Sequence, residues 1–257
     1  MANQKLRACV KSVVMACAMA SALGMVSGQA QAVSLGELIS SQGTITVGDK
    51  KFSDFRYTAN GFINDQTGSV WGNTEADYLA QAGMVTVTGD TQDGNHGLDF
   101  MSNWHAENGI EASFGIDYVV TVLDPTKYLS DFHLDGSPSA TGGGHVNVLE
   151  TVSDSVGHSL IPTTPPGSLN IYFHSETGLQ QNDFSLTNPG FMPKSAFIET
   201  DVTFSAPLNS TASLGHIQQS FSQAVPEPST FALALCGGIG ALWMSRRRQK
   251  AQEGVIA

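Results

Sequence analysis

The sequence predicts an all-β protein, an antiparallel β-sandwich, on the strength of three observations. Apolar and polar residues alternate along several short segments, β-branched and aromatic residues fill many of the apolar positions, and glycine and proline interrupt the segments. Period-two alternation of this kind is typical of strands that bury one face. Strands do not alternate with long helical patterns, which argues against a parallel α/β fold.

The predicted strands are spread over the middle of the chain and suggest one jelly-roll-like sandwich over residues 33–210. They are centred on residues 45–47, 85–88, 116–122, 146–148, 171–173 and 198–204. Two short helices are expected, Leu35–Ser41 with Ser34 as N-cap and Asn73–Ala82. Neither is long enough to cover a sheet. The polar residues 211–224 are expected to form a spacer after the sandwich.

The first 32 residues have the pattern of a cleavable secretory signal peptide. Three basic residues precede the apolar run Val13–Val26, and Ala30 and Ala32 supply a small-x-small cleavage site before Val33. A transmembrane helix is the alternative. The apolar run would span only about 21 Å as a helix, whereas the hydrocarbon core of a bilayer is about 30 Å thick.

The C-terminal residues 225–250 combine three parts, followed by a predicted cytoplasmic tail at 251–257. The parts are a Pro-Glu-Pro triplet, a short apolar segment and a basic cluster: Pro226, Glu227 and Pro228, then Phe231–Met244, then Arg246, Arg247 and Arg248. The prolines favour an extended segment, the apolar segment predicts a transmembrane helix, and the arginines would stop transfer on the cytoplasmic side.

This tail resembles the sorting signal of PEP-CTERM proteins, which occur in Gram-negative bacteria that make extracellular polysaccharide. The start of the predicted mature chain, residues 35–55, is also similar to that of many proteins with this tail. The resemblance implies cleavage by an exosortase-type membrane protease, a transient inner-membrane anchor, and delivery to the cell surface or extracellular matrix. A permanent single-pass anchor is the alternative.

The charge of the predicted exported body, residues 33–224, limits its partners. This segment holds 5 basic and 21 acidic residues, a net charge of −16. Such a body would be repelled by nucleic acid and would favour soluble cations, calcium in particular. All three cysteines, Cys9, Cys17 and Cys236, lie in the predicted signal peptide or apolar tail. The body therefore has no disulfide and no cysteine ligand for a metal.

One segment, Gly89–Asp99, is rich in oxygen ligands and is the candidate calcium loop. Its candidate ligands are Asp90, Asp93, Asn95 and Asp99. The spacing does not match an EF-hand, and the same residue types are common in plain turns. A solvated loop without metal is therefore the alternative, and no other cofactor is expected.

Trp71 and Trp104 are candidates for stacking on sugar rings, provided that they are exposed; burial in the core is the alternative. The seven histidines do not form a zinc-protease motif, and only His133 and His145 are expected to be able to meet, across a hairpin. Two carboxylate pairs, Glu111 with Asp117 and Asp131 with Asp135, would suit glycoside hydrolysis only if each stood about 5–10 Å apart.

Three functions remain open. The first is a non-enzymatic exported protein of the cell surface or matrix, associated with exopolysaccharide or biofilm. The second is a carbohydrate-binding or calcium-dependent adhesive module, and the third a secreted hydrolase. No residue is assigned a catalytic role, and the sequence favours a protein that is not an enzyme.

Overall fold

A computed structural model describes residues 32–61, 63–64, 69–70, 74–92, 94–161, 168–187 and 192–225. Several predicted features lie outside these ranges. They are most of the signal peptide, including Ala30, then Trp71 and Asp93, and the sorting signal with Pro226, Glu227, Pro228, Arg246, Arg247 and Arg248.

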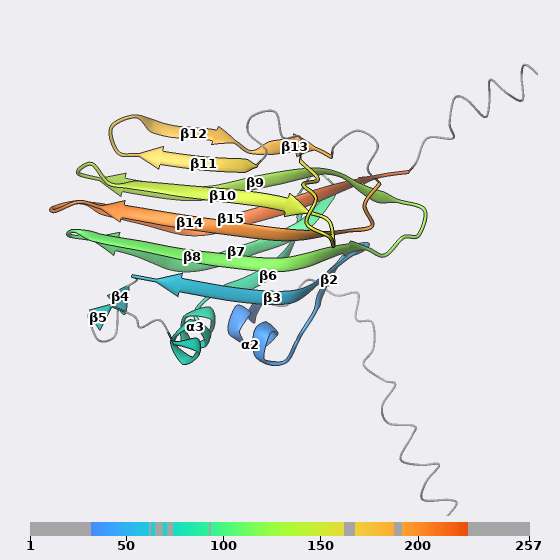
Figure 1. Ribbon diagram of the computed structural model, residues 1–257, viewed down its shortest axis with the longest axis horizontal. Coiled ribbons are helices and arrows are strands. Elements are labelled where there is room, and N and C mark those ends of the chain that lie inside the picture. Colours follow the sequence, from blue (N-terminus) through green and yellow to red (C-terminus); the bar gives the residue numbers. More distant parts are fainter. Residues whose placement is uncertain are drawn as a thin grey trace, which may run out of the picture.

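Two antiparallel sheets pack face to face, which confirms the predicted antiparallel β-sandwich (Figure 1). Sheet A has the strand order β1 (Val33–Ser34), β6 (Thr86–Gln92), β7 (Asn95–Glu107), β15 (Thr211–Ala224), β9 (Tyr128–Thr141) and β13 (Phe184–Leu186). Sheet B has the order β12 (Gly178–Asn182), β11 (Leu169–His174), β10 (His145–Ser153), β14 (Ser195–Ala206), β8 (Ile110–Val122), β3 (Lys50–Asn60) and β2 (Ile45–Val47). A separate pair is formed by β4 (Ile63–Asn64) and β5 (Ser69–Val70).

The core between the sheets is built from aromatic side chains at alternate strand positions. The Tyr118 ring lies 6.0 Å from that of Phe52 and 6.4 Å from that of Phe221, centroid to centroid. All three are fully buried, and full burial of each apolar side chain contributes about 1.5–3 kcal/mol. The predicted strand centres all overlap strands of the structure, because this inward alternation is what the sequence pattern records.

Both predicted helices are present and short. The helix α2 (Leu35–Ser40) begins at Ser34, whose hydroxyl accepts a hydrogen bond from the Glu37 N–H at 3.1 Å. The helix α3 (Glu75–Ala82) begins with a capping box between Thr74 and Asp77. They lie beside each other below β3 in Figure 1, next to the edge of sheet B that β3 and β2 form. Within the part of the chain that the structure describes, no helix is long and apolar enough to cross a membrane.

The predicted spacer over residues 211–224 is wrong, because this segment is β15, an interior strand of sheet A between β7 and β9. Ile217 and Phe221 are buried in the core. A bulge between Leu214 and Ile217 breaks the alternation, and the inward residue Gln219 is polar, so the segment does not read as a strand. The folded domain therefore extends to Ala224.

Candidate functional site

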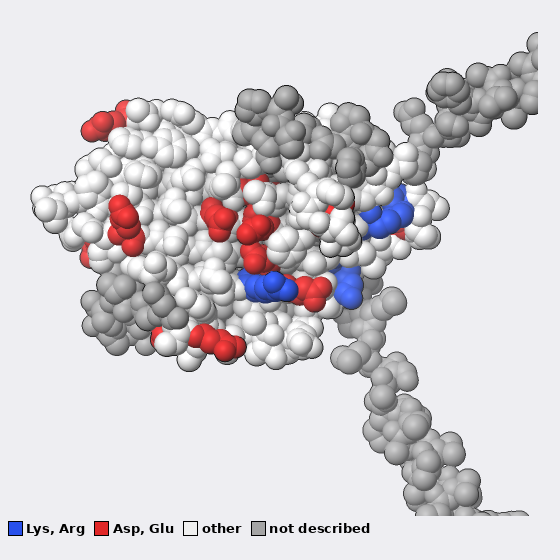
Figure 2. Space-filling view, in the orientation of Figure 1, with Lys and Arg blue, Asp and Glu red and all other residues white. Residues whose placement is uncertain are grey.

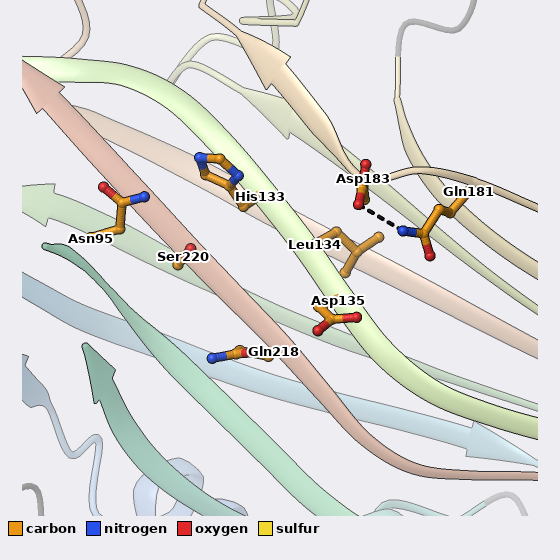
Figure 3. Close-up of a pocket in the computed structure, with 8 residues that line it drawn as sticks. All are labelled: Asn95, His133, Leu134, Asp135, Gln181, Asp183, Gln218 and Ser220. Atoms are coloured by element: carbon orange, nitrogen blue, oxygen red, sulfur yellow. Dashed lines mark hydrogen bonds between the residues drawn. The ribbon is translucent and has the colours of Figure 1, made fainter. Parts of the chain in front are cut away.

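A hollow of about 280 Å³ opens on the outer face of sheet A (Figure 3) and is termed the amide groove. It is lined by Asn95, His133, Leu134, Asp135, Gln181, Asp183, Gln218 and Ser220. Figure 3 shows Gln181 and Asp183 on one side of β9, with Asn95, Ser220 and Gln218 on the other. The groove therefore draws its polar groups from β7, β9, β15 and the chain around the end of β12.

The strand register brings these side chains to the same face. Ser220 pairs with Gly97 on β7 and with His133 on β9, while Gln218 pairs with Asp135 on β9. Directly paired residues project to the same side of a sheet. Sequence-distant residues thus form adjacent polar rows across three strands.

Gly97 is needed for the close approach of β7 to β15. A Cβ atom added there would lie 2.0 Å from the Gln219 carbonyl oxygen and 2.7 Å from the Ser220 Cα. Any side chain at this position would push the two strands apart and move Ser220. A glycine inside a strand often marks such an approach of backbones.

The groove side chains hold one another while keeping free hydrogen-bonding groups. Gln218 Nε2 donates to Asp90 at 2.6 Å, Gln181 Nε2 donates to Asp183 at 2.8 Å, and Asn95 Oδ1 accepts from the Ser222 hydroxyl at 2.6 Å. Each of these hydrogen bonds uses one end of a side-chain amide group. Among the described residues, Asn95 Nδ2, Gln218 Oε1 and the Ser220 hydroxyl have no hydrogen-bond partner. Asn95 Nδ2 and Gln218 Oε1 are therefore available to a ligand. Ser220 lines the groove but is only 5% exposed.

An aromatic ring stands beside the groove. Phe184 on β13 pairs with His133 on β9, and their ring centroids are 4.8 Å apart. The Phe184 side chain is 46% exposed. The imidazole of His133 is oriented by a hydrogen bond with Asp131, whose Oδ1 lies 3.1 Å from Nε2. A supported, solvent-accessible ring next to polar groups is suited to a ligand with both apolar and polar faces.

A carboxylate next to the groove is perturbed. Asp99 pairs with Gln218. Burial raises the pKa of Asp99; His216 lowers it, and the nearby carboxylates Asp90 and Asp135 raise it. Its Oδ1 is buried without a hydrogen-bond partner in the described part of the chain. Asp99 is thus poorly suited to carrying a full negative charge in the absence of a partner.

The candidate calcium loop is a β-hairpin in the structure rather than a loop. Asp90 pairs with Gly97 and Gln92 with Asn95, so most of Gly89–Asp99 belongs to β6 and β7. Asp90 and Asn95 already accept hydrogen bonds within sheet A. Among the residues described, no group of three or more His, Cys, Asp or Glu side chains is arranged to hold a metal ion. Calcium binding stays a prediction.

Trp104 does not meet the condition of exposure for stacking on sugar, because its ring belongs to the core, which was the alternative. Trp104 is only 4% exposed and stacks on Phe114 at a centroid distance of 4.5 Å. Its indole N–H donates to the Tyr57 hydroxyl at 3.3 Å. Trp104 occupies one of the inward-facing positions of β7, so its ring is buried in the core and is not available to a sugar.

His133 and His145 do not meet across a hairpin. Their strands belong to different sheets, and each side chain projects to the outer face of its own sheet. His145 instead packs beside His174 and Tyr172 on the outer face of sheet B, with centroid distances of 6.0 and 5.8 Å. The chain passes from sheet A to sheet B between β9 and β10, so these strands do not form the hairpin across which the two histidines could have met.

Neither predicted carboxylate pair has the spacing for glycoside hydrolysis. Glu111 and Asp117 lie six positions apart on β8, about 20 Å along a strand, and Asp131 and Asp135 lie about 13 Å apart on β9. Required separations are about 5–10 Å.

Sheet B instead places Asp117 opposite Glu199. Burial, together with the neighbouring Glu199 carboxylate, raises the pKa of Asp117 to about 6. Figure 2 looks onto this outer face and shows acidic side chains gathered at its centre, over β8 and β14. A partly buried pair of like charges explains the raised pKa.

Several residues of the amide groove and its neighbouring aromatic ring were not predicted from the sequence. Gln218 and Ser220 lie in the segment expected to be a spacer, and Phe184 lies in a strand of three residues. The polar positions of β15 carried no pattern that would distinguish them from a linker. A three-residue strand is too short for its alternation to be recognised.

Comparison with known proteins gives weak structural likenesses. No protein-family profile matches the chain, and no curated protein does. TmCBM61 in complex with beta-1,4-galactotriose is 10% identical, covers 65% of this chain and 88% of its own, and gives a TM-score of 0.28. A structure from work on carbohydrate-binding modules of the β-sandwich superfamily is 8% identical over 70% of this chain, with a TM-score of 0.29. This chain spans 58% of that second structure. Similarity at this level carries no functional argument, which must come from the residues themselves.

Proposed function

We propose that this chain is a non-catalytic carbohydrate-binding protein that holds a neutral polysaccharide in the amide groove. The observation that carries the proposal is the convergence of unpaired amide and hydroxyl groups beside the exposed Phe184 ring. This favours the carbohydrate-binding alternative over a purely structural surface protein.

The chemistry of the groove suits sugar hydroxyl groups. Each hydroxyl both donates and accepts hydrogen bonds, and a planar amide such as that of Asn95 or Gln218 offers both kinds of group. The apolar C–H face of a sugar ring can pack on an aromatic ring, here that of Phe184. A few convergent polar groups next to an apolar contact are typical of a small-molecule site.

The charge of the body selects among polysaccharides. With a net charge of −16 over residues 33–224, the chain would repel a polysaccharide that carries carboxylate or sulfate groups. A neutral polysaccharide meets no such repulsion. We therefore assign the neutral class as the ligand.

The placement of perturbed carboxylates favours binding over hydrolysis. A glycosidase needs a proton-donating acid with a raised pKa next to the scissile bond. The described carboxyl groups with raised pKa values are Asp99, Asp117 and Glu150, and none of them lines the amide groove.

We further propose that the domain is exported and processed by an exosortase-type protease, then retained near the polysaccharide it binds. The first strand starts at Val33, directly after the predicted cleavage site, and β15 ends at Ala224, two residues before Pro226. This supports processing, because removal of both terminal segments would leave in place every strand that the structure describes. Mass spectrometry of the exported protein should find a C-terminus near residues 226–228. Recovery of the intact chain through Arg248 would contradict processing.

Affinity electrophoresis tests the binding proposal. The full chain is run through native gels containing β-1,4-galactan, xylan, dextran or, as the acidic comparison, alginate. We expect retardation by at least one neutral polysaccharide and none by alginate. Gln218→Ala and Phe184→Ala should each weaken the retardation about fivefold, the effect of one lost hydrogen bond or stacking contact.

Leu186→Ala is the matched control, because Leu186 is an exposed apolar residue of the same strand that pairs with Asp131, whereas Phe184 pairs with the groove residue His133. Its retardation should equal that of the unmodified chain. Retardation that survives both groove variants unchanged, or that is seen only with alginate, would contradict the proposed site or ligand class.

A further inference from the structure

We infer that the outer face of sheet B carries a second polysaccharide site, so that one molecule bridges two polysaccharide chains. The inference rests on the proposed function and extends it from binding to cross-linking. It is carried by an uninterrupted line of hydrogen-bonding side chains that runs across six neighbouring strands, termed the cross-sheet row.

The strand register defines the cross-sheet row. Each member pairs directly with the next, in the order Asn60, Ser113, Thr203, Asn147, Tyr172 and Gln180. Neighbouring strands are about 4.8 Å apart, so the row is about 24 Å long. Directly paired side chains share a face. The row is therefore a continuous line of polar side chains that is long enough to contact several linked sugar units.

The members of the row are accessible. None of the six is buried. Asn147 Oδ1 accepts a hydrogen bond from Asn170 at 2.7 Å, which orients its amide, and Asn147 Nδ2 has no partner among the described residues. At one end the Tyr172 ring lies 5.8 Å from His145 and 6.4 Å from His174, centroid to centroid. The row thus offers an oriented amide next to a group of rings.

The surface is hollowed beside the row. A cavity of about 470 Å³ is lined by Asn60, Ser113, Asn147 and Thr203, together with Thr58 and Asp201 of the adjoining positions. Gly115 lies on its floor, where an added Cβ would stand 2.9 Å from the Thr58 hydroxyl and 3.5 Å from Asp201 Oδ1. Any side chain at Gly115 would therefore crowd Thr58 and narrow this part of the cavity.

The charge on this face matches the ligand class of the amide groove. All six members of the cross-sheet row are uncharged at neutral pH. Figure 2 shows uncharged surface between the acidic side chains near the left end of this face and those at its centre. Acidic polysaccharide would be repelled here as well, so the second ligand is again a neutral polysaccharide.

The two sites face in opposite directions. The two sites lie on the outer faces of two sheets, and these sheets pack against each other at a distance of about 10 Å. Two polysaccharide chains can therefore be held on opposite sides of one domain. Such bivalent attachment gives an avidity that neither site has alone.

Light scattering with the full chain and the neutral polysaccharide identified by electrophoresis tests the bridging. The unmodified chain should raise the scattering of the polysaccharide solution, with a maximum at an intermediate ratio of protein to polysaccharide. Asn147→Ala and, separately, Tyr172→Ala remove one contact from the cross-sheet row, and Gln218→Ala removes one from the amide groove. Ser153→Ala, on the same strand and face as Asn147 but outside the row, is the matched control.

Each site variant should still be retarded measurably in the gel, but its scattering maximum should be at least about fivefold lower than that of the unmodified chain. Ser153→Ala should match the unmodified chain in both measurements. Unchanged thermal melting of Asn147→Ala checks that the fold is intact. If Asn147→Ala and Tyr172→Ala both scatter like the unmodified chain, the second site is refuted while the amide groove stands. If no neutral polysaccharide retards any form of the chain, the proposed binding of neutral polysaccharide is itself refuted.

Discussion

Replacing one buried carboxyl group should change how stability depends on pH. Glu150 lies on β10 with 0% exposure. Its Oε2 accepts a hydrogen bond from Gln219, which also donates to Thr200 at 2.6 Å and accepts from the Tyr118 hydroxyl at 2.8 Å. Glu150 Oε1 has no partner in the described part of the chain. Burial raises the pKa of Glu150 to about 8, although the hydrogen bond from Gln219 lowers it.

The size of the effect follows from the difference between the folded and unfolded pKa values. The folded state keeps a proton that the unfolded state, with a pKa near 4.5, releases. The stabilising difference is therefore complete below pH 4.5 and is lost as pH rises toward 8. At about 1.4 kcal/mol per pKa unit, the loss is about 3 kcal/mol at pH 7 and approaches about 5 kcal/mol above pH 8.

Glu150→Gln should remove most of this pH dependence, because a glutamine has the shape and hydrogen-bonding capacity of the protonated acid. Urea unfolding at pH 5 and pH 8 measures it. The unmodified chain should lose about 4 kcal/mol between these pH values, and the variant should lose far less. Glu111→Gln, at an exposed position of β8, is the control and should behave like the unmodified chain. Parallel pH profiles for the unmodified chain and Glu150→Gln would refute the reasoning.

Three further predictions concern the core, a surface carboxylate and calcium. Trp104→Ala should lower the free energy of unfolding by about 3–5 kcal/mol in urea titrations, because it empties a buried stacking position; a loss below about 1 kcal/mol would contradict burial. In an NMR titration, Asp117 should protonate near pH 6, and Glu199→Gln should shift that midpoint downward; an unmoved midpoint would remove Glu199 as a cause. If the hairpin Gly89–Asp99 binds calcium as the sequence predicts, millimolar CaCl2 should raise the melting temperature and EGTA should reverse the rise; an unchanged melting temperature would contradict a calcium site.

The sandwich was predictable because its strands carry the inward alternation in their own sequence. Val146 and Val148 on β10, and Ile198 and Val202 on β14, are all buried as the pattern requires. Ser34 also signalled the start of α2. These features depend on residues close together in the chain, where propensity and capping act directly.

The amide groove was not predictable, because its geometry depends on strand register. Gln218 reaches Asp90, and Asn95 reaches Ser222, across strands that are far apart in the sequence. The bulge in β15 sets that register and at the same time conceals the strand. No local pattern in one sequence records which distant strands become neighbours.

The side-chain amide groups of the groove allow the central claim to be measured directly. Isotope-labelled full chain is titrated with an oligosaccharide of the polysaccharide that retards it, and the NH2 resonances of Asn95, Gln181 and Gln218 are followed by NMR. The account predicts saturable shifts of these resonances, reduced by Phe184→Ala. Saturable binding that leaves all three resonances unmoved would contradict it.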